Sequence, residues 1–158
     1  MGAINQAFNQ AAGAMAGAGL AIKHAKETEE SKMNTLDNSA LVARNQARSA
    51  EAEANAANDE AVKKGGLAEQ MAAAEVNKEK AEKAYDKASN RKNGSIKTKL
   101  KKMNDLMAAQ EAEWALKNKY KAIKDINNRA TEQRIYAAKA TKMALDAKEK
   151  FEKRWGGK

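Results

Sequence analysis

Residues 33–61 read MNTLDNSALVARNQARSAEAEANAANDEA, and the pattern of this stretch predicts a helical fold for the chain. Small or apolar residues recur in it at alternating steps of three and four, which brings them onto one side of a helix. We call this set the first seam, and its spacing predicts a packing face. It consists of Met33, Leu36, Ala40, Ala43, Ala47, Ala50, Ala54, Ala57 and Ala61.

A second seam with the same alternating spacing lies near the end of the chain. Alanine, which dominates both seams, buries little apolar surface but lets helices approach closely. Such faces favour an assembly of many helices over an isolated pair. We therefore predict an all-α fold of long, extended helices that associate as a coiled coil or a multi-helix oligomer. The second seam consists of Ile123, Ile126, Ala130, Gln133, Ala137, Ala140, Ala144, Ala147 and Phe151.

The composition supports helices and excludes several kinds of chemistry. The 158 residues contain no Pro and no Cys, and only 4% are aromatic. No residue therefore forbids a helix, and strong helix formers supply most of the sequence. The lack of Cys rules out disulfides, thiol catalysis and thiolate metal sites.

Charge divides the chain unevenly. Residues 1–22 carry no charge, residues 23–89 hold 11 basic and 13 acidic residues, and residues 90–158 hold 19 basic and 8 acidic residues. A basic half is suited to phosphates or to anionic lipid headgroups. The alternative interpretation is that these lysines lie on solvated helical faces.

Glycine and asparagine mark the expected ends of helices. Gly65-Gly66 predicts a helix C-cap or hinge, and Asn93-Gly94-Ser95 predicts a second break. Asn34 or Thr35 is a candidate N-cap within the first half, although nothing there strongly separates the flanking helices. The expected helices cover residues 3–32, 35–64, 67–91 and 96–154.

These boundaries predict three regions. Residues 1–32 form a neutral Gly/Ala-rich amphipathic helix, residues 33–92 hold seam helices joined at the Gly65-Gly66 hinge, and residues 93–158 form a long basic helix. Within the last region an apolar series precedes the second seam. The step from Trp114 to Ile123 does not fit the alternating spacing, so it predicts a change in the phase of the apolar repeat along the helix. That series consists of Ile96, Leu100, Met103, Met107 and Trp114.

The uncharged start is a candidate surface for membrane or subunit contact. Its apolar residues lie on one helical face, and Gly13 and Gly17 form a G-x-x-x-G pair that permits close helix crossing. Its length suits a bilayer core, but its four amide side chains oppose insertion as an isolated helix. A packed amphipathic helix inside an assembly is the alternative. The candidate contact residues are Ile4, Phe8, Gly13, Met15, Gly17 and Ile22.

The densest basic cluster is a candidate nucleic-acid contact. The basic half lacks interleaved aromatic residues for base stacking, so any contact is expected with the phosphate backbone, with strong salt dependence and no sequence preference. The residues concerned are Arg91, Lys92, Lys97, Lys99, Lys101 and Lys102.

Catalytic signatures are missing from the sequence. Its one histidine, His24, lies among charged residues on an expected helix and is interpreted as solvated. Gly65-Gly66-Leu67 lacks the spacing of a phosphate-binding loop, and no hydrolase or metalloprotease motif occurs. We predict no catalytic residue, no metal, no cofactor and no enzymatic activity.

The order of these regions resembles that of phage genome-delivery proteins. The Gly/Ala-rich start from Gly2-Ala3-Ile4 to Gly17-Ala18-Gly19, followed directly by Ala/Gln/Asn/Lys/Glu-rich helix, is similar to the DNA pilot proteins of small icosahedral phages and the internal ejection proteins of short-tailed phages. The likeness covers the layout of the whole chain. It implies a virion protein that forms a homo-oligomer, contacts other virion or portal proteins, DNA or membrane, and acts in the host cell envelope during infection.

Three other classes remain open. A helical scaffold of a capsid or portal needs the seams but not the uncharged start. A stress-protective protein of the late-embryogenesis-abundant type would be a disordered monomer in dilute solution. The apolar residues between positions 96 and 126 disfavour this class, because a disordered chain would leave them exposed to water. A non-specific nucleic-acid-binding protein depends on the basic half alone.

Overall fold

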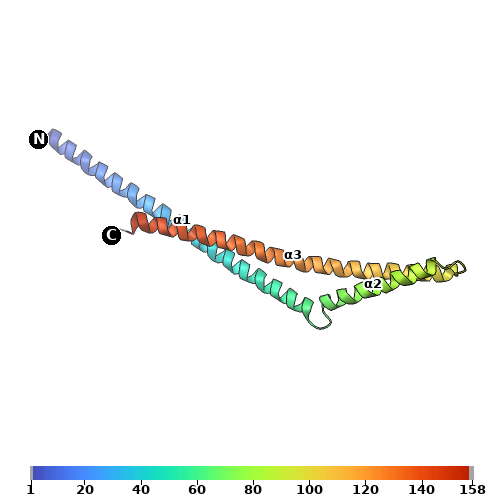
Figure 1. Ribbon diagram of the computed structural model, residues 1–158. Coiled ribbons are helices and arrows are strands. Elements are labelled where there is room, and N and C mark those ends of the chain that lie inside the picture. Colours follow the sequence, from blue (N-terminus) through green and yellow to red (C-terminus); the bar gives the residue numbers. More distant parts are fainter. Residues whose placement is uncertain (1, 157–158) are drawn as a thin grey trace. The chain divides into compact units, whose positions relative to one another are not determined.

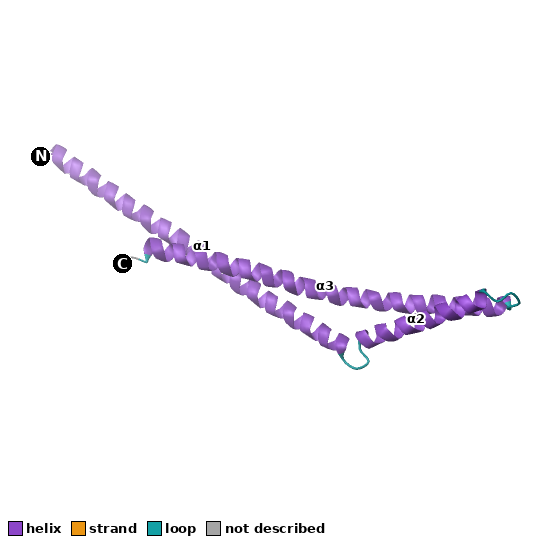
Figure 2. Ribbon diagram, viewed as in Figure 1, coloured by secondary structure: helices purple, strands orange, loops and turns teal. Residues whose placement is uncertain are grey.

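Three helices make up the chain in a computed structural model that describes residues 2–156, without the side chains of residues 2, 3, 8 and 11–13. They are α1 (Gly2–Val62), α2 (Leu67–Ser89) and α3 (Ile96–Trp155). Figures 1 and 2 show these helices and the two short connections between them. The predicted all-α fold is therefore confirmed, and no strand occurs among the residues described.

The first two expected helices form one continuous helix. Asn34 and Thr35 lie inside α1, so neither residue caps a helix. The hydroxyl of Thr35 instead donates a hydrogen bond to the carbonyl of Ser31, at 2.9 Å, as a threonine does within a helix. The physical reason is that this stretch contains no Gly or Pro to interrupt α1.

Both expected breaks separate helices. Gly65 has φ of +76°, a conformation that favours glycine, and the Gly66 amide donates to the Lys63 carbonyl at 2.8 Å. Two side chains at the start of α2 complete this turn: Glu69 accepts from the Gly65 amide at 2.8 Å, and Gln70 donates to the Gly65 carbonyl at 2.9 Å. At the second break, the Ser95 carbonyl accepts the backbone bond of Lys99 at 3.1 Å.

The chain forms two compact units, which divide both long helices. Unit 1 comprises Met1–Ala47 and Gln133–Lys158, and unit 2 comprises Arg48–Glu132. Unit 1 therefore contains the first part of α1 and the last part of α3. Unit 2 contains the end of α1, all of α2 and the first part of α3.

In unit 1, α1 and α3 run antiparallel. Glu29 bonds to Trp155, and Met33 and Leu36 share a hollow with Ala147 and Phe151, so residue numbers rise on one helix as they fall on the other. The most deeply buried side chains of the chain lie here, because Ala40 and Ala43 are only 1% exposed. Ala137 and Ala144 on α3 are also buried.

In unit 2, the end of α1 contacts the middle of α3 through a reciprocal amide pair. Asn58 and Asn127 each donate to the other's side-chain oxygen at 2.9 Å, and Asn127 also donates to the Ile123 carbonyl. Ala61, Leu67 and Ile123 line one hollow where the three helices of this unit meet. An alanine seam offers little to distinguish one register from another, and this polar pair supplies such a distinction.

Every position of both seams is buried or half-buried. Within each unit, the first-seam residues on α1 and the second-seam residues on α3 lie on the antiparallel faces just described. The helices are long, as expected, and within each unit the chain itself covers these faces. The reason is that Gly65-Gly66 and Asn93-Gly94 act as turns that let the helices of unit 2 pack against one another.

The apolar series at the start of α3 supplies only one residue, Met103, to the packed face. Ile96 and Trp114 are 76% and 68% exposed, and Leu100 and Met107 are also exposed. Because α3 is one continuous helix, its contact with α1 near Ile123 fixes the rotation of α3 about its axis. This rotation in turn fixes which side of the preceding turns of α3 faces α2. That half-buried stripe advances by steps of three and four, and it consists of Met103, Leu106, Ala109, Glu113 and Leu116.

The packed stripe of α3 does not change phase between Trp114 and Ile123, contrary to the expectation, because Trp114 is exposed and lies outside that stripe. Ile123 follows Leu116 by seven residues and so continues the half-buried stripe. Ile123, Ile126 and Asn127 are all half-buried, which widens the packed side of the helix at this point. The second seam then continues from Ala130 toward the end of α3.

Candidate functional site

The uncharged start of the chain forms the first part of α1, and we call residues 2–22 the arm. All of its described side chains are exposed, and Ile4 and Met15 reach 75%. In Figure 1 this part of α1 continues past the C-terminal end of α3. The arm therefore presents apolar side chains that its own unit does not cover.

Glycine positions in the arm are open to approach. A Cβ atom added at Gly17 or at Gly19 would meet no atom within 4 Å. Ile22 is exposed, whereas the side-chain positions of Phe8 and Gly13 lie outside those that the structure describes. Among the helices described, none combines the length and apolar character needed to cross a membrane.

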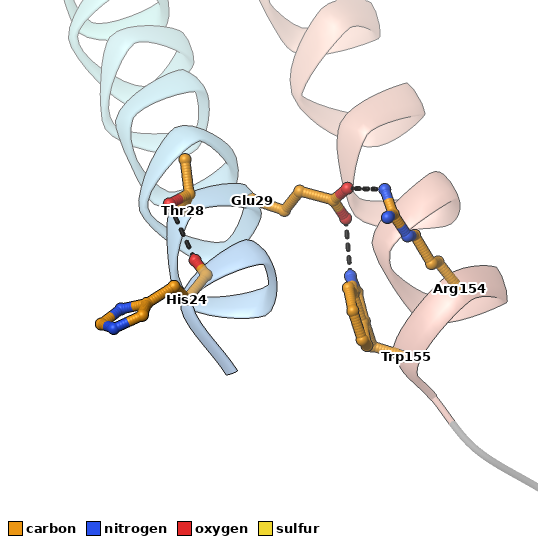
Figure 3. A network of polar contacts seen from close by, with 5 residues as sticks. All are labelled: His24, Thr28, Glu29, Arg154 and Trp155. Carbon is orange, nitrogen blue, oxygen red and sulfur yellow. Dashed lines mark hydrogen bonds and ion pairs between the residues drawn. The ribbon is translucent and has the colours of Figure 1, made fainter. Parts of the chain in front are cut away.

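A polar clasp joins α1 to the end of α3 just beyond the arm (Figure 3). One oxygen of Glu29 accepts from Arg154, and the other accepts from the Trp155 indole nitrogen at 2.6 Å. The Arg154 guanidinium lies 4.9 Å from the centre of the Trp155 ring, within the range of a cation–π contact. The sequence gives no local signal for this clasp, because only the antiparallel register of α1 and α3 brings residues so distant in sequence together.

The single histidine lies beside this clasp but takes no part in it. His24 is exposed, its Nδ1 lies 3.9 Å from a Glu27 oxygen, and its carbonyl accepts from the Thr28 hydroxyl at 2.8 Å. Its imidazole points away from Glu29 and Trp155 in Figure 3. Among the residues described, no group of three metal-ligating side chains is present.

The basic cluster surrounds the connection between α2 and α3. Arg91 and Lys92 lie in this connection, whereas Lys97, Lys99, Lys101 and Lys102 lie in the first two turns of α3. Lys99 and Lys102 are half-buried, and the other four are exposed. Residues 87–102 contain seven Lys or Arg and no Asp or Glu, so this end of unit 2 is strongly positive.

Glu113 connects α2 to α3 by an ion-pair network. Its Oε1 lies 2.6 Å from Lys117 on the same helix, and its Oε2 lies 3.4 Å from Lys78 on α2. The hydrogen bond from Lys117, together with the two positive charges, lowers the pKa of Glu113 although partial burial acts in the opposite direction. The same hydrogen bond raises the pKa of Lys117.

We expect Glu113→Gln to lower the melting temperature at pH 7, because it removes the charge that both lysines contact. The lowered pKa means that this stabilisation is complete above the carboxyl's ordinary value of 4.5 and is lost as pH falls through the folded-state pKa. The difference in melting temperature between wild type and variant should therefore shrink in acid. Thermal unfolding followed by circular dichroism at several pH values measures this difference.

Glu149→Gln is the matched control, because Glu149 also pairs with a lysine four residues later but its side chain is 64% exposed. Exposed pairs of this kind contribute little to stability. An equal loss of melting temperature in both variants would contradict the role assigned to Glu113.

Comparisons with known proteins identify no relative: no protein-family model matches the chain, and no curated protein or solved structure is significantly similar to it. The arm, the clasp and the basic cluster are therefore the features of this chain that bear on its function.

Proposed function

We propose that this chain is a non-enzymatic helical protein of phage virions that assembles with copies of itself and assists delivery of the genome across the host envelope. One observation carries the proposal. The uncharged arm is helical, and its described side chains are exposed, while the alanine seams are already covered within each unit. The order of regions described above, from neutral start to basic half, supports the same class of protein.

The location of the seams supports assembly through the arm. Both seams are buried or half-buried within the same chain, which leaves less of their surface for a second copy. The arm has no such cover among the described residues, and it carries no charge that would oppose association with lipid or with other arms.

The arm has two chemically distinct faces. At 100° per residue, Ile4, Met15 and Ile22 share one face, and Gly13 and Gly17 lie on roughly the opposite side. In a membrane, apolar side chains face lipid well, and small residues let neighbouring helices approach closely. An arm that cannot span a bilayer alone would thus associate with other arms at the bilayer and pair its amide side chains there.

Sedimentation velocity of the full chain, with and without lipid vesicles, tests this proposal. We expect a discrete oligomer that sediments with the vesicles. Replacing Gly13 and Gly17 together by Leu should reduce the oligomer and its release of a vesicle-trapped dye at least about tenfold, because the larger side chains separate the helices. Leucine also favours helix over glycine, so the arm should stay helical.

Gly19→Leu is the matched control, because Gly19 is equally open but lies on the side of the apolar face. This variant should keep both oligomer and dye release. A wild-type monomer that leaves vesicles intact would overturn the proposal and favour a scaffold bound to a capsid or portal. Full dye release by the Gly13 and Gly17 variant would exclude assembly through the glycine face.

A further inference from the structure

We propose that the beginning of α3 and the connection before it form a docking surface for an anionic lipid bilayer, separate from the arm. We call this the tip surface. It lies entirely within unit 2 and is independent of the proposed function. It consists of Arg91, Lys92, Ile96, Lys97, Leu100, Met107 and Trp114.

An exposed apolar row is the first observation. Ile96, Leu100, Met107 and Trp114 are each at least half exposed, and their spacing of four, seven and seven residues puts them on one side of α3. The row is about 27 Å long at 1.5 Å per residue. The packed stripe that includes Ala109 and Glu113 lies on a different side, so burying this row would not disturb the contact with α2.

Positive charge beside this row is the second observation. Arg91, Lys92 and Lys97 are exposed at its beginning, where no carboxylate occurs between residues 87 and 102, whereas Glu111 lies beside Met107 and Trp114 at its far end. The long stems of Lys and Arg let their charged ends reach lipid phosphates while nearby apolar residues enter the interface. Trp114 lies at the far end of the row, and tryptophan is enriched where bilayer meets water.

These two features together favour a bilayer over nucleic acid. Binding to a DNA backbone depends mainly on cations, and it would leave the four large exposed apolar side chains without a partner. An anionic bilayer accommodates both, because headgroups attract the cations and the acyl boundary accepts the apolar row. Since no described helix is apolar enough to cross a membrane, α3 would lie along the surface.

The tip surface and the arm differ in the lipid that they require. The arm is uncharged, so its association with vesicles should be insensitive to lipid charge and to salt. Binding through the tip surface should need anionic lipid and should weaken at high ionic strength, where electrostatic attraction is screened.

Co-sedimentation of the full chain with phosphatidylcholine vesicles, with and without phosphatidylglycerol, tests the tip surface. We expect phosphatidylglycerol to increase binding and salt to reverse that increase. The increase should fall at least about tenfold in the Ile96→Gln, Leu100→Gln variant, because two side chains no longer enter the interface. It should fall about fivefold for each of Lys92→Gln and Lys97→Gln.

Ile135→Gln, Leu145→Gln is the matched control, because it removes the same two residue types from exposed positions of α3 in unit 1. This control should bind like wild type. All the substituted residues are exposed, so circular dichroism should be unchanged. Normal anionic-lipid binding by the Ile96 and Leu100 variant, or equal loss in the control, would overturn the proposal.

Arm variants separate this proposal from the previous one. Loss of anionic-lipid binding in Met15→Gln, Ile22→Gln but not in Ile96→Gln, Leu100→Gln would overturn the tip surface and support the arm. The reverse result would support the tip surface. Binding to duplex DNA that needs Lys92 and Lys97 but not Ile96 and Leu100, without binding to anionic vesicles, would overturn the lipid proposal in favour of nucleic acid.

Discussion

Ala137→Leu should destabilise the chain by about 1–3 kcal/mol, although both residues are apolar and leucine is a good helix former. Ala137 is 6% exposed and lies on the α3 face that packs against α1 in unit 1. The seam residues facing it are small, so three further carbon atoms would find no space. The helices would have to separate and lose the close contact along neighbouring alanines.

Urea unfolding followed by circular dichroism measures this loss as a lower midpoint. Ala138→Leu is the matched control, because the adjacent alanine on the same helix is exposed. Its effect should stay within about 0.5 kcal/mol of zero. Equal midpoints for the two variants would show that the alanine face of α3 is not closely packed.

Gly66→Ala should also destabilise the chain by about 1–3 kcal/mol, because it forces strain into the turn between α1 and α2. An added Cβ would lie 2.5 Å from the Glu60 carbonyl oxygen and 2.8 Å from those of Ala61 and Lys63. These oxygens belong to the backbone at and just after the end of α1. The steric clash is therefore relieved only if the end of α1 and the start of α2 move apart, and Leu67 is buried at that start.

Gly19→Ala makes the same substitution in the arm where nothing lies within 4 Å and away from the glycine face, and it is the control. Inside a helix this change is favourable by about 0.5–1 kcal/mol, since glycine loses more backbone freedom on folding. The two variants should therefore shift the thermal unfolding midpoint in opposite directions. A Gly66→Ala protein that unfolds at the wild-type midpoint would be inconsistent with the tight turn.

Much of the secondary structure was predictable because its causes are local. A chain without Pro and rich in Ala, Lys and Glu forms helices, and Gly65-Gly66 and Asn93-Gly94 interrupt them. The continuity of α1 through Asn34 and Thr35 has a local cause as well. A residue that suits an N-cap begins a new helix only where the backbone before it leaves the helical conformation.

The candidate surfaces were predictable in part. Charge and hydropathy indicated the uncharged arm and the basic cluster, since these are properties of consecutive residues. The clasp of Glu29 with Arg154 and Trp155 and the amide pair of Asn58 with Asn127 join residues far apart in sequence. No local pattern distinguishes these carboxylate and amide groups from the many others on the helices.

Local pattern was enough to predict the helical character of the chain, its two breaks and the membership of each seam, because spacing alone fixes which residues share one side of a helix. What covers each side depends on tertiary packing. It paired the seams within the chain and left Ile96 and Trp114 exposed, although an apolar series is expected to be buried. The physical reason is that a helix packs through one stripe at a time, and α3 meets α2 through the stripe that includes Glu113 once its rotation is fixed near Ile123.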